Sequence, residues 1–318
     1  MQPGVDLRRG LLLVGLALEL ACLLAFQRLG GARPDLGVAL LLAAFLPYGA
    51  ALAVARRLRG SIARLALAAT LLLHLALLGR GPTLDDDLWR YRWEGRVVLA
   101  GHNPYRHTPD DPALAPLRDA AWSRVAFRHV PTVYPPLAEL LFAAGVALGG
   151  GSPLALRLLA LAGHGLSLAL LAALLAGAGL PRRRLLAYAW NPLVVKEVAD
   201  SAHVDPWMAA GVLAALLWVQ RRRAARAPWP LAAAIGVKWV PLLTLPLWRR
   251  ALGRRGVALT LLLVGLLLLP FAGAGRGLFA GLATYADWWV FNPGVYWGLR
   301  GLLDPHLELA ASKAVAKG

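Results

Sequence analysis

Three aspartates stand side by side at residues 85–87, where they could do acid–base chemistry. Adjacent carboxylates repel one another, and this repulsion raises the pKa of one of them towards useful basicity. A carboxylate of that kind is suited to take the proton of an attacking hydroxyl group in a transition state. The spacing does not indicate which of the three would act. The run therefore predicts a polar reaction site, and it leaves open the simpler interpretation of a solvated helix cap.

The triplet lies where a membrane-spanning helix would reach the surface, because an apolar segment over residues 65–78 precedes it. Carboxylates are costly in lipid, so the cluster needs compensation. Residues 86–98 fit a short helix, on which Trp89 and Trp93 stand four apart and would stack in adjacent turns. The acids would occupy its N-terminal end, where the helix dipole stabilises negative charge. The pattern predicts a helix on the membrane surface with aromatic rings at headgroup depth.

Two lysines, Lys196 and Lys238, lie inside apolar segments. The chain has four lysines against thirty arginines, and arginine dominates the basic loops. An ionisable group inside a membrane segment is a functional candidate by default. Lys196 is also placed to form an ion pair with Glu197 or Asp200. The alternative for both lysines is that the long side chain snorkels to the membrane interface.

The elements that position these residues are expected to be membrane helices. Hydrophobic residues make up 58% of the 318 residues, and the mean hydropathy is +0.58. Apolar runs of roughly 18 or more residues recur along the chain. The composition predicts one all-α domain over residues 1–318, a polytopic transmembrane helix bundle of about nine or ten segments, some broken or re-entrant. The expected segments are about 10–29, 35–55, 61–79, 134–149, 153–178, 184–199, 206–220, 229–248 and 256–273.

The segment at 10–29 follows Arg8 and Arg9, as the apolar part of a signal peptide would. It is long and lacks a small-residue cleavage site, so it is expected to be a retained helix. The single cysteine, Cys22, lies inside it and supports neither a disulfide framework nor a metal cluster. Residues 310–318 are expected to be a trimmed end.

The formal net charge of +17 arises from arginines in short loops between apolar runs. The clusters lie at residues 56–59, 182–184, 221–223 and 249–255. That distribution is typical of cytoplasmic loops that meet anionic headgroups, and it argues against a nucleic-acid partner. The only long polar loop, 80–133, then falls on the external side. Simple counting would place the second and third clusters outside, so at least one segment between 134 and 180 must be broken or re-entrant.

The segment at 229–248 shows how a broken span would look. It carries Pro230, Gly236, Lys238, Pro241 and Pro246, and basic clusters flank it on both sides. Two basic flanks predict that the segment enters and leaves on the cytoplasmic side as a helical hairpin. Proline-interrupted membrane helices are tolerated where their backbone lines a polar cavity.

Several strings in and after the long loop carry a resemblance to a known family. They are Asp86-Asp87-Leu88-Trp89-Arg90-Tyr91-Arg92-Trp93-Glu94-Gly95-Arg96, Gly101-His102-Asn103-Pro104-Tyr105 and Thr132-Val133-Tyr134-Pro135-Pro136-Leu137. Further strings are Trp190-Asn191-Pro192-Leu193, the stretch 197–205 and Val237-Lys238-Trp239-Val240-Pro241. Their order and spacing over about residues 60–300 resemble the GT-C superfamily, which consists of polytopic glycosyltransferases that use polyprenyl-phosphate sugars. The closest similarity is to bacterial mannosyltransferase-like members.

The resemblance implies an inverting transfer of a hexose, in this case mannose, from a polyprenyl-phosphate donor to a hydroxyl of a glycan, lipid or protein acceptor. In that superfamily an acidic residue of the first large external loop is the catalytic base, which corresponds here to Asp86 or Asp87. A cation beside the departing lipid phosphate would favour the transition state, and we assign this role to Lys238. The other expected substrate-binding residues are Asp85, Arg90, Tyr91, Trp93, Glu94, Asn103, Tyr105, Tyr134, His203 and Asp205.

Some of these roles keep an alternative. Glu94 is expected to orient the acceptor or a loop arginine. Asp205 would equally cap the helix that starts at Pro206. Three adjacent carboxylates are suited to hold Mg²⁺ or Mn²⁺, but metal dependence varies among relatives and no metal ligand is assigned. The long loop 80–133 is expected to carry the site and short interfacial helices on the external, periplasmic face of the cell's inner membrane.

Two other functions remain open. The same scaffold would suit another sugar, such as arabinose, glucose or a deoxy sugar. A lipid-linked sugar flippase or secondary transporter would also have broken helices and buried charges. Transporters, however, concentrate ionisable residues at mid-membrane in repeated halves. Here the acids cluster in one loop and the sequence shows no internal repeat, which favours the enzyme.

Overall fold

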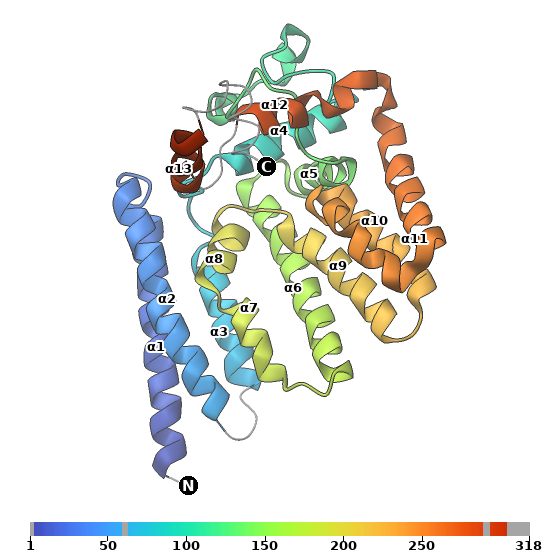
Figure 1. The fold of residues 1–318 in the computed structure, drawn as a ribbon. Helices are drawn as coiled ribbons and strands as arrows, with labels where there is room; N and C mark the ends of the chain where they lie inside the picture. Colours follow the sequence, from blue (N-terminus) through green and yellow to red (C-terminus); the bar gives the residue numbers. More distant parts are fainter. Residues whose placement is uncertain (1–2, 59–62, 289–292, 304–318) are drawn as a thin grey trace.

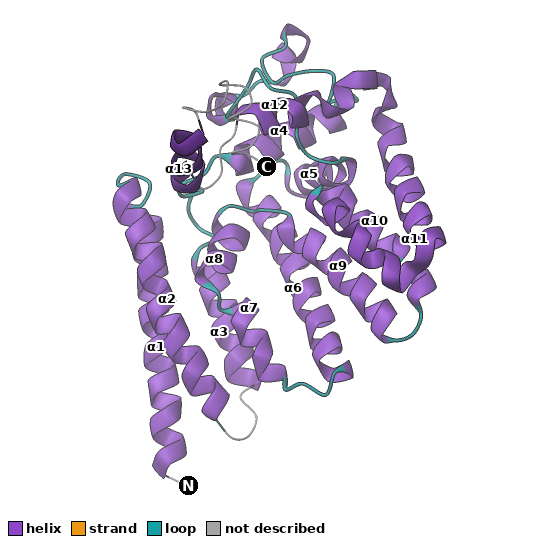
Figure 2. Cartoon of the chain, in the orientation of Figure 1, coloured by secondary structure: helices purple, strands orange, loops and turns teal. Residues whose placement is uncertain are grey.

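The computed structural model describes residues 3–58, 63–288 and 293–303, and every regular element in these residues is a helix (Figure 2). The α-helices are α1 (Pro3–Leu29), α2 (Pro34–Arg57), α3 (Ala63–Ala76), α4 (Asp87–Leu99), α5 (Pro136–Gly149), α6 (Pro153–Gly177), α7 (Leu186–Ala189), α8 (Pro192–Val195), α9 (Asp205–Gln220), α10 (Pro228–Val237), α11 (Leu245–Leu268), α12 (Ala280–Trp288) and α13 (Pro293–Leu303). The 3-10 helices are η1 (Pro112–Leu117), η2 (Ala120–Arg124), η3 (Arg182–Leu185), η5 (Ala224–Arg226), η6 (Val240–Thr244) and η7 (Leu269–Phe279), and η4 (Lys196–Asp200) is a π-helix. The predicted all-α class is confirmed. The expected trimmed end at 310–318 lies outside the described residues.

Four stretches are long and apolar enough to cross a membrane: Leu7–Leu29, Pro34–Arg57, Pro153–Gly177 and Val240–Asp287. Another candidate is the pair Pro192–Asp200 and Asp205–Gln220, which is bent by 118°. Several expected spans are shorter helices, because α3 and α5 have 14 residues each and α10 has 10. A helix of 14 residues is about 21 Å long, less than the roughly 30 Å of a bilayer core. The protein is a polytopic helix bundle in which short and broken segments accompany the full spans.

The arginine clusters gather at one end of the bundle, the lower end in Figure 1, and the loop of residues 80–133 lies at the other. We call these the basic end and the loop end. At the basic end, Arg8 Nη1 donates to the carbonyl of Arg57 at 3.0 Å, and η5 contacts α11. The arrangement agrees with the expected gathering of arginines on one side.

Helix α5 explains how the clusters at 182–184 and 221–226 share the basic end. The chain enters α5 from the long loop, and just after its last turn Gly151 O accepts a hydrogen bond of 2.6 Å from Arg92 Nε of α4. Both ends of α5 therefore stay at the loop end, and α6 begins there and runs to the basic end (Figure 1). Helix α5 therefore does not cross from the loop end to the basic end, which agrees with the broken or re-entrant segment expected between 134 and 180.

The hairpin expected over 229–248 is present. Helix α10 packs against α11, and regular helix geometry stops between them at Lys238, with φ −151° and ψ 140°. Lys238 is the tip of this hairpin and lines a cavity together with residues of the long loop. A second break lies at Gly253, at the basic end of α11, where φ is 66° and ψ is 179°. Glycine adopts such a positive φ readily.

The helix predicted over 86–98 is α4, but it is covered on two sides by protein. Tyr91 stacks on Phe142 of α5 with ring centroids 4.4 Å apart. Gly95 permits this close approach, because a Cβ there would lie 2.5 Å from the Phe142 carbonyl oxygen. On the other side the loop covers Trp93, which is 2% exposed. The interpretation of Trp93 as a ring at headgroup depth is therefore wrong.

Candidate active site

The three adjacent aspartates point to three different places. Asp85 faces η4, Asp86 is exposed in a small cleft beside Trp89, and Asp87 lines the cavity between the loop and the hairpin. The backbone bends sharply just before them, since Leu84 has a φ of 67°, a strained value for a leucine. Asp86 occupies the N-cap position of α4 but makes no side-chain cap hydrogen bond, so the helix-cap interpretation gains no support.

The main cavity at the loop end has a volume of about 550 Å³. Its walls come from α4, from loop residues 126–135, from the hairpin tip at 238–240 and from α12. Most of the lining is apolar. Asp87 is its acidic residue, and Lys238 is its lysine. A cavity of this size with a few convergent polar groups is typical of a small-molecule or lipid-headgroup site.

Two tyrosines surround Asp87. The Tyr91 and Tyr134 hydroxyls lie 3.5 and 3.4 Å from Asp87 Oδ2. Burial is the main cause that raises the pKa of both phenols, and the nearby Asp87 charge raises them further. Both hydroxyls therefore remain protonated and can donate to the carboxylate. They orient Asp87 without removing its ability to accept another proton.

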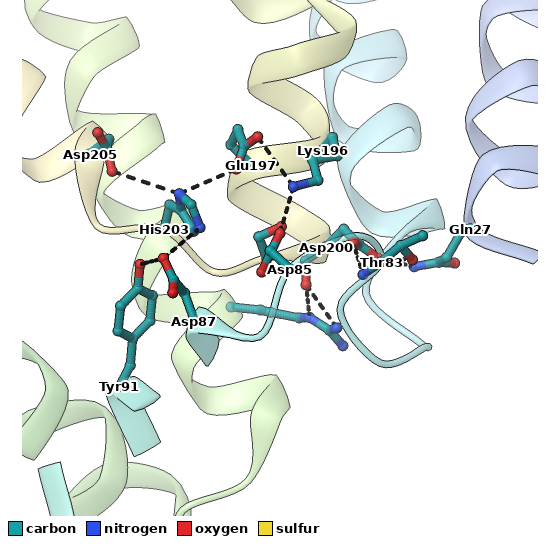
Figure 3. A network of polar contacts seen from close by, with 12 residues as sticks. Gln27, Thr83, Asp85, Asp87, Tyr91, Lys196, Glu197, Asp200, His203 and Asp205 are labelled. Atoms are coloured by element: carbon teal, nitrogen blue, oxygen red, sulfur yellow. Dashed lines mark hydrogen bonds and ion pairs between the residues drawn. The ribbon is translucent and has the colours of Figure 1, made fainter. Parts of the chain in front are cut away.

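His203 lies at the centre of a network of polar contacts (Figure 3). Its Nε2 is 3.7 Å from Asp87 Oδ2, and its Nδ1 is 3.2 Å from Glu197 Oε2 and 3.9 Å from Asp205 Oδ2. The side chain thus joins α4, η4 and the start of α9. His203 contacts Asp87 but is not among the residues that line the cavity.

Asp205 pairs with Lys238 and does not cap a helix. Asp205 Oδ1 accepts from Lys238 Nζ at 2.6 Å, whereas the N-cap position of α9 belongs to Val204. The capping alternative for Asp205 is therefore wrong, because its carboxylate is turned towards the hairpin tip. The ion pair fixes the ammonium at the cavity wall, where the side chain of Lys238 keeps 37% of its surface exposed.

Lys196 is buried and does not snorkel. Its Nζ lies 2.5 Å from Asp85 Oδ2 and 3.2 Å from Glu197 Oε1, and the Ser201 hydroxyl also donates to Asp85. The predicted ion pair with Glu197 is confirmed. The pairing with Asp85 joins residues 111 positions apart, which local spacing could not show.

Asp200, the other partner considered for Lys196, instead holds the turn before α4. Its carboxylate accepts from Gln27 Nε2 at 3.0 Å and from the backbone N of Thr83 at 2.6 Å. The Arg157 guanidinium donates to the Asp200 carbonyl at 2.8 Å and to the Leu78 carbonyl at 2.7 Å. These contacts tie α1, α6 and η4 to the segment that presents the aspartates (Figure 3).

Arg90 and Glu94 form a buried ion pair within α4, with Nε 2.6 Å from Oε1. Arg90 also donates to the carbonyls of Phe127 and Val130 at 3.1 and 2.8 Å. The pair therefore holds the loop wall of the cavity. This agrees with the expectation that Glu94 orients an arginine, and Arg90 itself lines the cavity.

Seven expected substrate-binding residues do not line the cavity: Asp85, Trp93, Glu94, Asn103, Tyr105, His203 and Asp205. Three of these hold the loop together. Asn103 Nδ2 donates to the Phe271 carbonyl at 3.0 Å, and the Tyr105 hydroxyl donates to the Tyr134 carbonyl at 2.8 Å. Trp93 packs in the loop core. Because Asn103, Tyr105 and Trp93 are engaged in holding the loop together, we correct their role from contacting substrate to shaping the site.

Among the cavity-lining residues that the sequence reasoning did not assign to the site, two have polar side-chain atoms, Trp239 and Tyr285. Trp239, next to Lys238, has a buried Nε1 without a hydrogen-bond partner among the described residues. Tyr285 of α12 reaches the cavity from far along the chain. Trp239 belongs to the motif Val237-Lys238-Trp239-Val240-Pro241, and its place in that motif was a reason to consider it. Nothing in the sequence around Tyr285 indicated that it would reach the cavity.

The three aspartates do not converge on one point, so they do not form the metal site considered from their adjacency. A different group, Asp85, Glu197 and His203, offers ligand atoms that lie within 4.8 Å of one another. Carboxylate and imidazole donors suit transition metals better than Mg²⁺. The Lys196 ammonium, however, already contacts both carboxylates and supplies positive charge there.

Comparison with known families decides the class of this protein. The family described as alpha-(1->6)-mannopyranosyltransferase, N-terminal domain, matches residues 7–254. The chain belongs to this family. The resemblance to GT-C mannosyltransferases is thereby confirmed, and this mannosyltransferase family implies a sugar donor and a glycan acceptor. The matched part includes Asp87, His203 and Lys238 and ends at the Gly253 break. No curated protein and no solved structure matches the chain.

Proposed function

We propose that this mannosyltransferase moves mannose from a polyprenyl-phosphate donor to a hydroxyl of a glycan, on the external side of the inner membrane. The observation that carries the proposal is the cavity at the loop end, where Asp87 and Lys238 stand on different walls of about 550 Å³ of mostly apolar space. The external side follows from the gathering of arginines at the opposite end.

Asp87 is the proposed base. Its carboxylate takes the proton from the acceptor hydroxyl while the hydroxyl oxygen forms a bond to the anomeric carbon of mannose. The bond between that carbon and the phosphate oxygen breaks, and the oxygen keeps the electron pair. The leaving group is therefore a polyprenyl phosphate with one more negative charge. Asp87 is preferred to Asp86 because Asp86 lies outside the cavity.

Lys238 is the proposed partner of the leaving phosphate. Its ammonium is held at the cavity wall by Asp205 at 2.6 Å, and the side chain keeps open surface. A positive charge fixed where negative charge develops stabilises the transition state more than the ground state. The indole of Trp239 lines the cavity next to it. The apolar lining suits the first isoprene units of the donor.

The family description also suggests the linkage. An alpha-(1->6) bond would form if the acceptor is the 6-hydroxyl group of a mannose. Inversion at the anomeric carbon gives an α product only from a β-linked donor, so we propose β-linked polyprenyl-phosphate mannose as the substrate.

The test compares Asp87→Asn with Asp86→Asn in purified protein, using polyprenyl-phosphate mannose and an α-mannoside acceptor. Asp87→Asn is expected to slow transfer by about 10² to 10⁴-fold, the usual contribution of a general base, while donor binding persists. Asp86→Asn is the matched control and is expected to stay within about twofold of wild type, since surface changes away from a site have small effects.

Wild-type transfer by the Asp87→Asn protein would remove the base assignment. A wild-type protein that transfers no mannose, yet moves lipid-linked sugar across liposomes, would favour the transporter.

A further inference from the structure

A second pair of cavities lies at the basic end, away from the proposed active site. The first, which we call the arginine pocket, has a volume of about 590 Å³. It is lined by Leu52, Ala55, Arg56, Pro181, Arg183, Arg184 and Ala187. Two separate segments, the last turn of α2 and η3, bring its three guanidinium groups to one opening.

No ion pair with a described residue neutralises this charge. No acidic side chain lines the arginine pocket, and no ion pair is recorded for Arg56, Arg183 or Arg184 among the described residues. The end of α2 carries a partial negative charge that favours Arg56. This helix-dipole effect fades within one turn, and η3 is too short to carry a comparable dipole. Guanidinium groups are forked donors whose geometry matches a phosphate, so the pocket is suited to a phosphate group.

An apolar cavity of about 580 Å³ adjoins the arginine pocket. The two share Ala55, Pro181 and Arg183, so they form one continuous site with a charged part and an apolar part. The apolar part lies between α2, α3, α6 and α7, and its lining has no acidic residue either. We call it the apolar pocket.

We infer that these two pockets bind an anionic phospholipid, with the phosphate on the three arginines and an acyl chain between α2, α3 and α6. The apolar pocket distinguishes such a lipid from a soluble phosphate, which would leave that space unused. The position at the basic end, at the ends of the spanning helices α2 and α6, places it at the headgroup level of the leaflet that faces the arginines. The inference does not depend on the proposed catalytic roles.

The lipid would join parts of the fold that otherwise share few contacts. Near the pocket, the Tyr48 hydroxyl of α2 donates to the Ala187 carbonyl at 2.7 Å. A phosphate held jointly by Arg56 and by Arg183 and Arg184 would add a second tie between α2 and the segment that leads into α7 and α8.

The experiment measures phosphatidylglycerol retained by the purified full chain in neutral detergent, by native mass spectrometry, with phosphatidylcholine as the comparison lipid. The test variant is Arg183→Gln/Arg184→Gln. The matched control is Arg221→Gln/Arg222→Gln, which removes the same charge from the same end but lies outside the pocket. Each arginine near an anionic lipid contributes about fivefold to the binding affinity. The test variant is therefore expected to bind phosphatidylglycerol about 25-fold more weakly than wild type, and the control is expected to bind it with nearly unchanged affinity.

A second variant, Ala169→Phe, fills the apolar pocket from α6 without altering charge. It is expected to weaken phosphatidylglycerol binding several-fold, and inorganic phosphate is expected not to displace the lipid. Undiminished binding by the arginine test variant, or an equal loss in the control, would overturn the site. Displacement by inorganic phosphate, or tighter binding of polyprenyl phosphate than of phosphatidylglycerol, would overturn the identity of the ligand. Unfolding temperatures in phosphatidylcholine show that each variant is folded.

Discussion

At the loop end, charges of both signs lie in contact, whereas at the basic end three arginines face a pocket whose lining contains no acidic residue. Asp205 meets Lys238 at 2.6 Å and Asp85 meets Lys196 at 2.5 Å, with His203 among the acids. A charge held by partners keeps a fixed position, which electrostatic catalysis requires. Charges left unpaired by the protein are available to an anion from outside. We propose that the first arrangement serves catalysis and the second lipid binding.

Lys238→Ala should have the largest effect among changes that test this comparison. It removes the proposed phosphate partner and leaves Asp205 with an unpaired charge. We expect kcat/KM to fall about 100-fold, with weaker donor binding, because fixed charge near a developing anion contributes on this scale. Steady-state transfer kinetics and donor titration measure both effects. Lys238→Arg is the control and should retain most binding; a Lys238→Ala protein with wild-type affinity and rate would contradict the phosphate role.

His203→Gln should have a smaller effect. Its ring stands 3.7 Å from Asp87 and 3.2 Å from Glu197 and does not line the cavity, so we expect it to position the proposed base without touching substrate. We expect kcat to fall about tenfold, since second-layer partners commonly contribute 10- to 100-fold, and KM to change little. Steady-state kinetics that determine kcat and KM separately measure this effect. A rise in KM alone would show instead that His203 contacts the donor.

The loop should become labile in acid. A hydrogen bond from Arg92, with the charges of Arg92 and Arg96, lowers the pKa of Asp119 from 3.8 to about 2. A lowered pKa contributes stability that is present above about pH 4 and lost as the pH falls towards 2. Pepsin cleavage of the loop should therefore accelerate over this window. Asp119→Asn should be cleaved faster than wild type above about pH 4, and the difference should shrink as the pH falls towards 2. Asp110→Asn is the control. A wild-type pH step that survives in Asp119→Asn would contradict the assignment.

The smallest change is expected at the basic end. Without anionic lipid, Arg183→Gln/Arg184→Gln should alter the free energy of unfolding by no more than about 0.5 kcal/mol, since no described partner is left unpaired. Thermal unfolding in neutral detergent measures it. A loss of several kcal/mol would show that these arginines, like Lys196, are held by the protein, and the contrast between the ends would disappear.

Some parts of the fold could be predicted from sequence because their signals are local. The helix over 86–98 and the hairpin over 229–248 follow from side-chain spacing, prolines and flanking charge. The arginine pattern required a broken or re-entrant segment between 134 and 180, and α5 is a short helix that stays at the loop end. The prediction that Trp93 lies at the membrane surface was wrong, because its burial depends on which parts of the loop cover it. The periodicity of one helix does not contain that information.

Sequence by itself determined the helical class, the arginine-rich side and the strings that connect the chain to a mannosyltransferase family. These depend on composition and on residues close in the chain. The tertiary structure alone decided which aspartate meets the cavity, because a turn at Leu84 sends three neighbours in three directions. It also decided the pairing of Asp85 with Lys196 and of Asp205 with Lys238. Such contacts form between distant segments, and packing of the whole bundle sets their geometry.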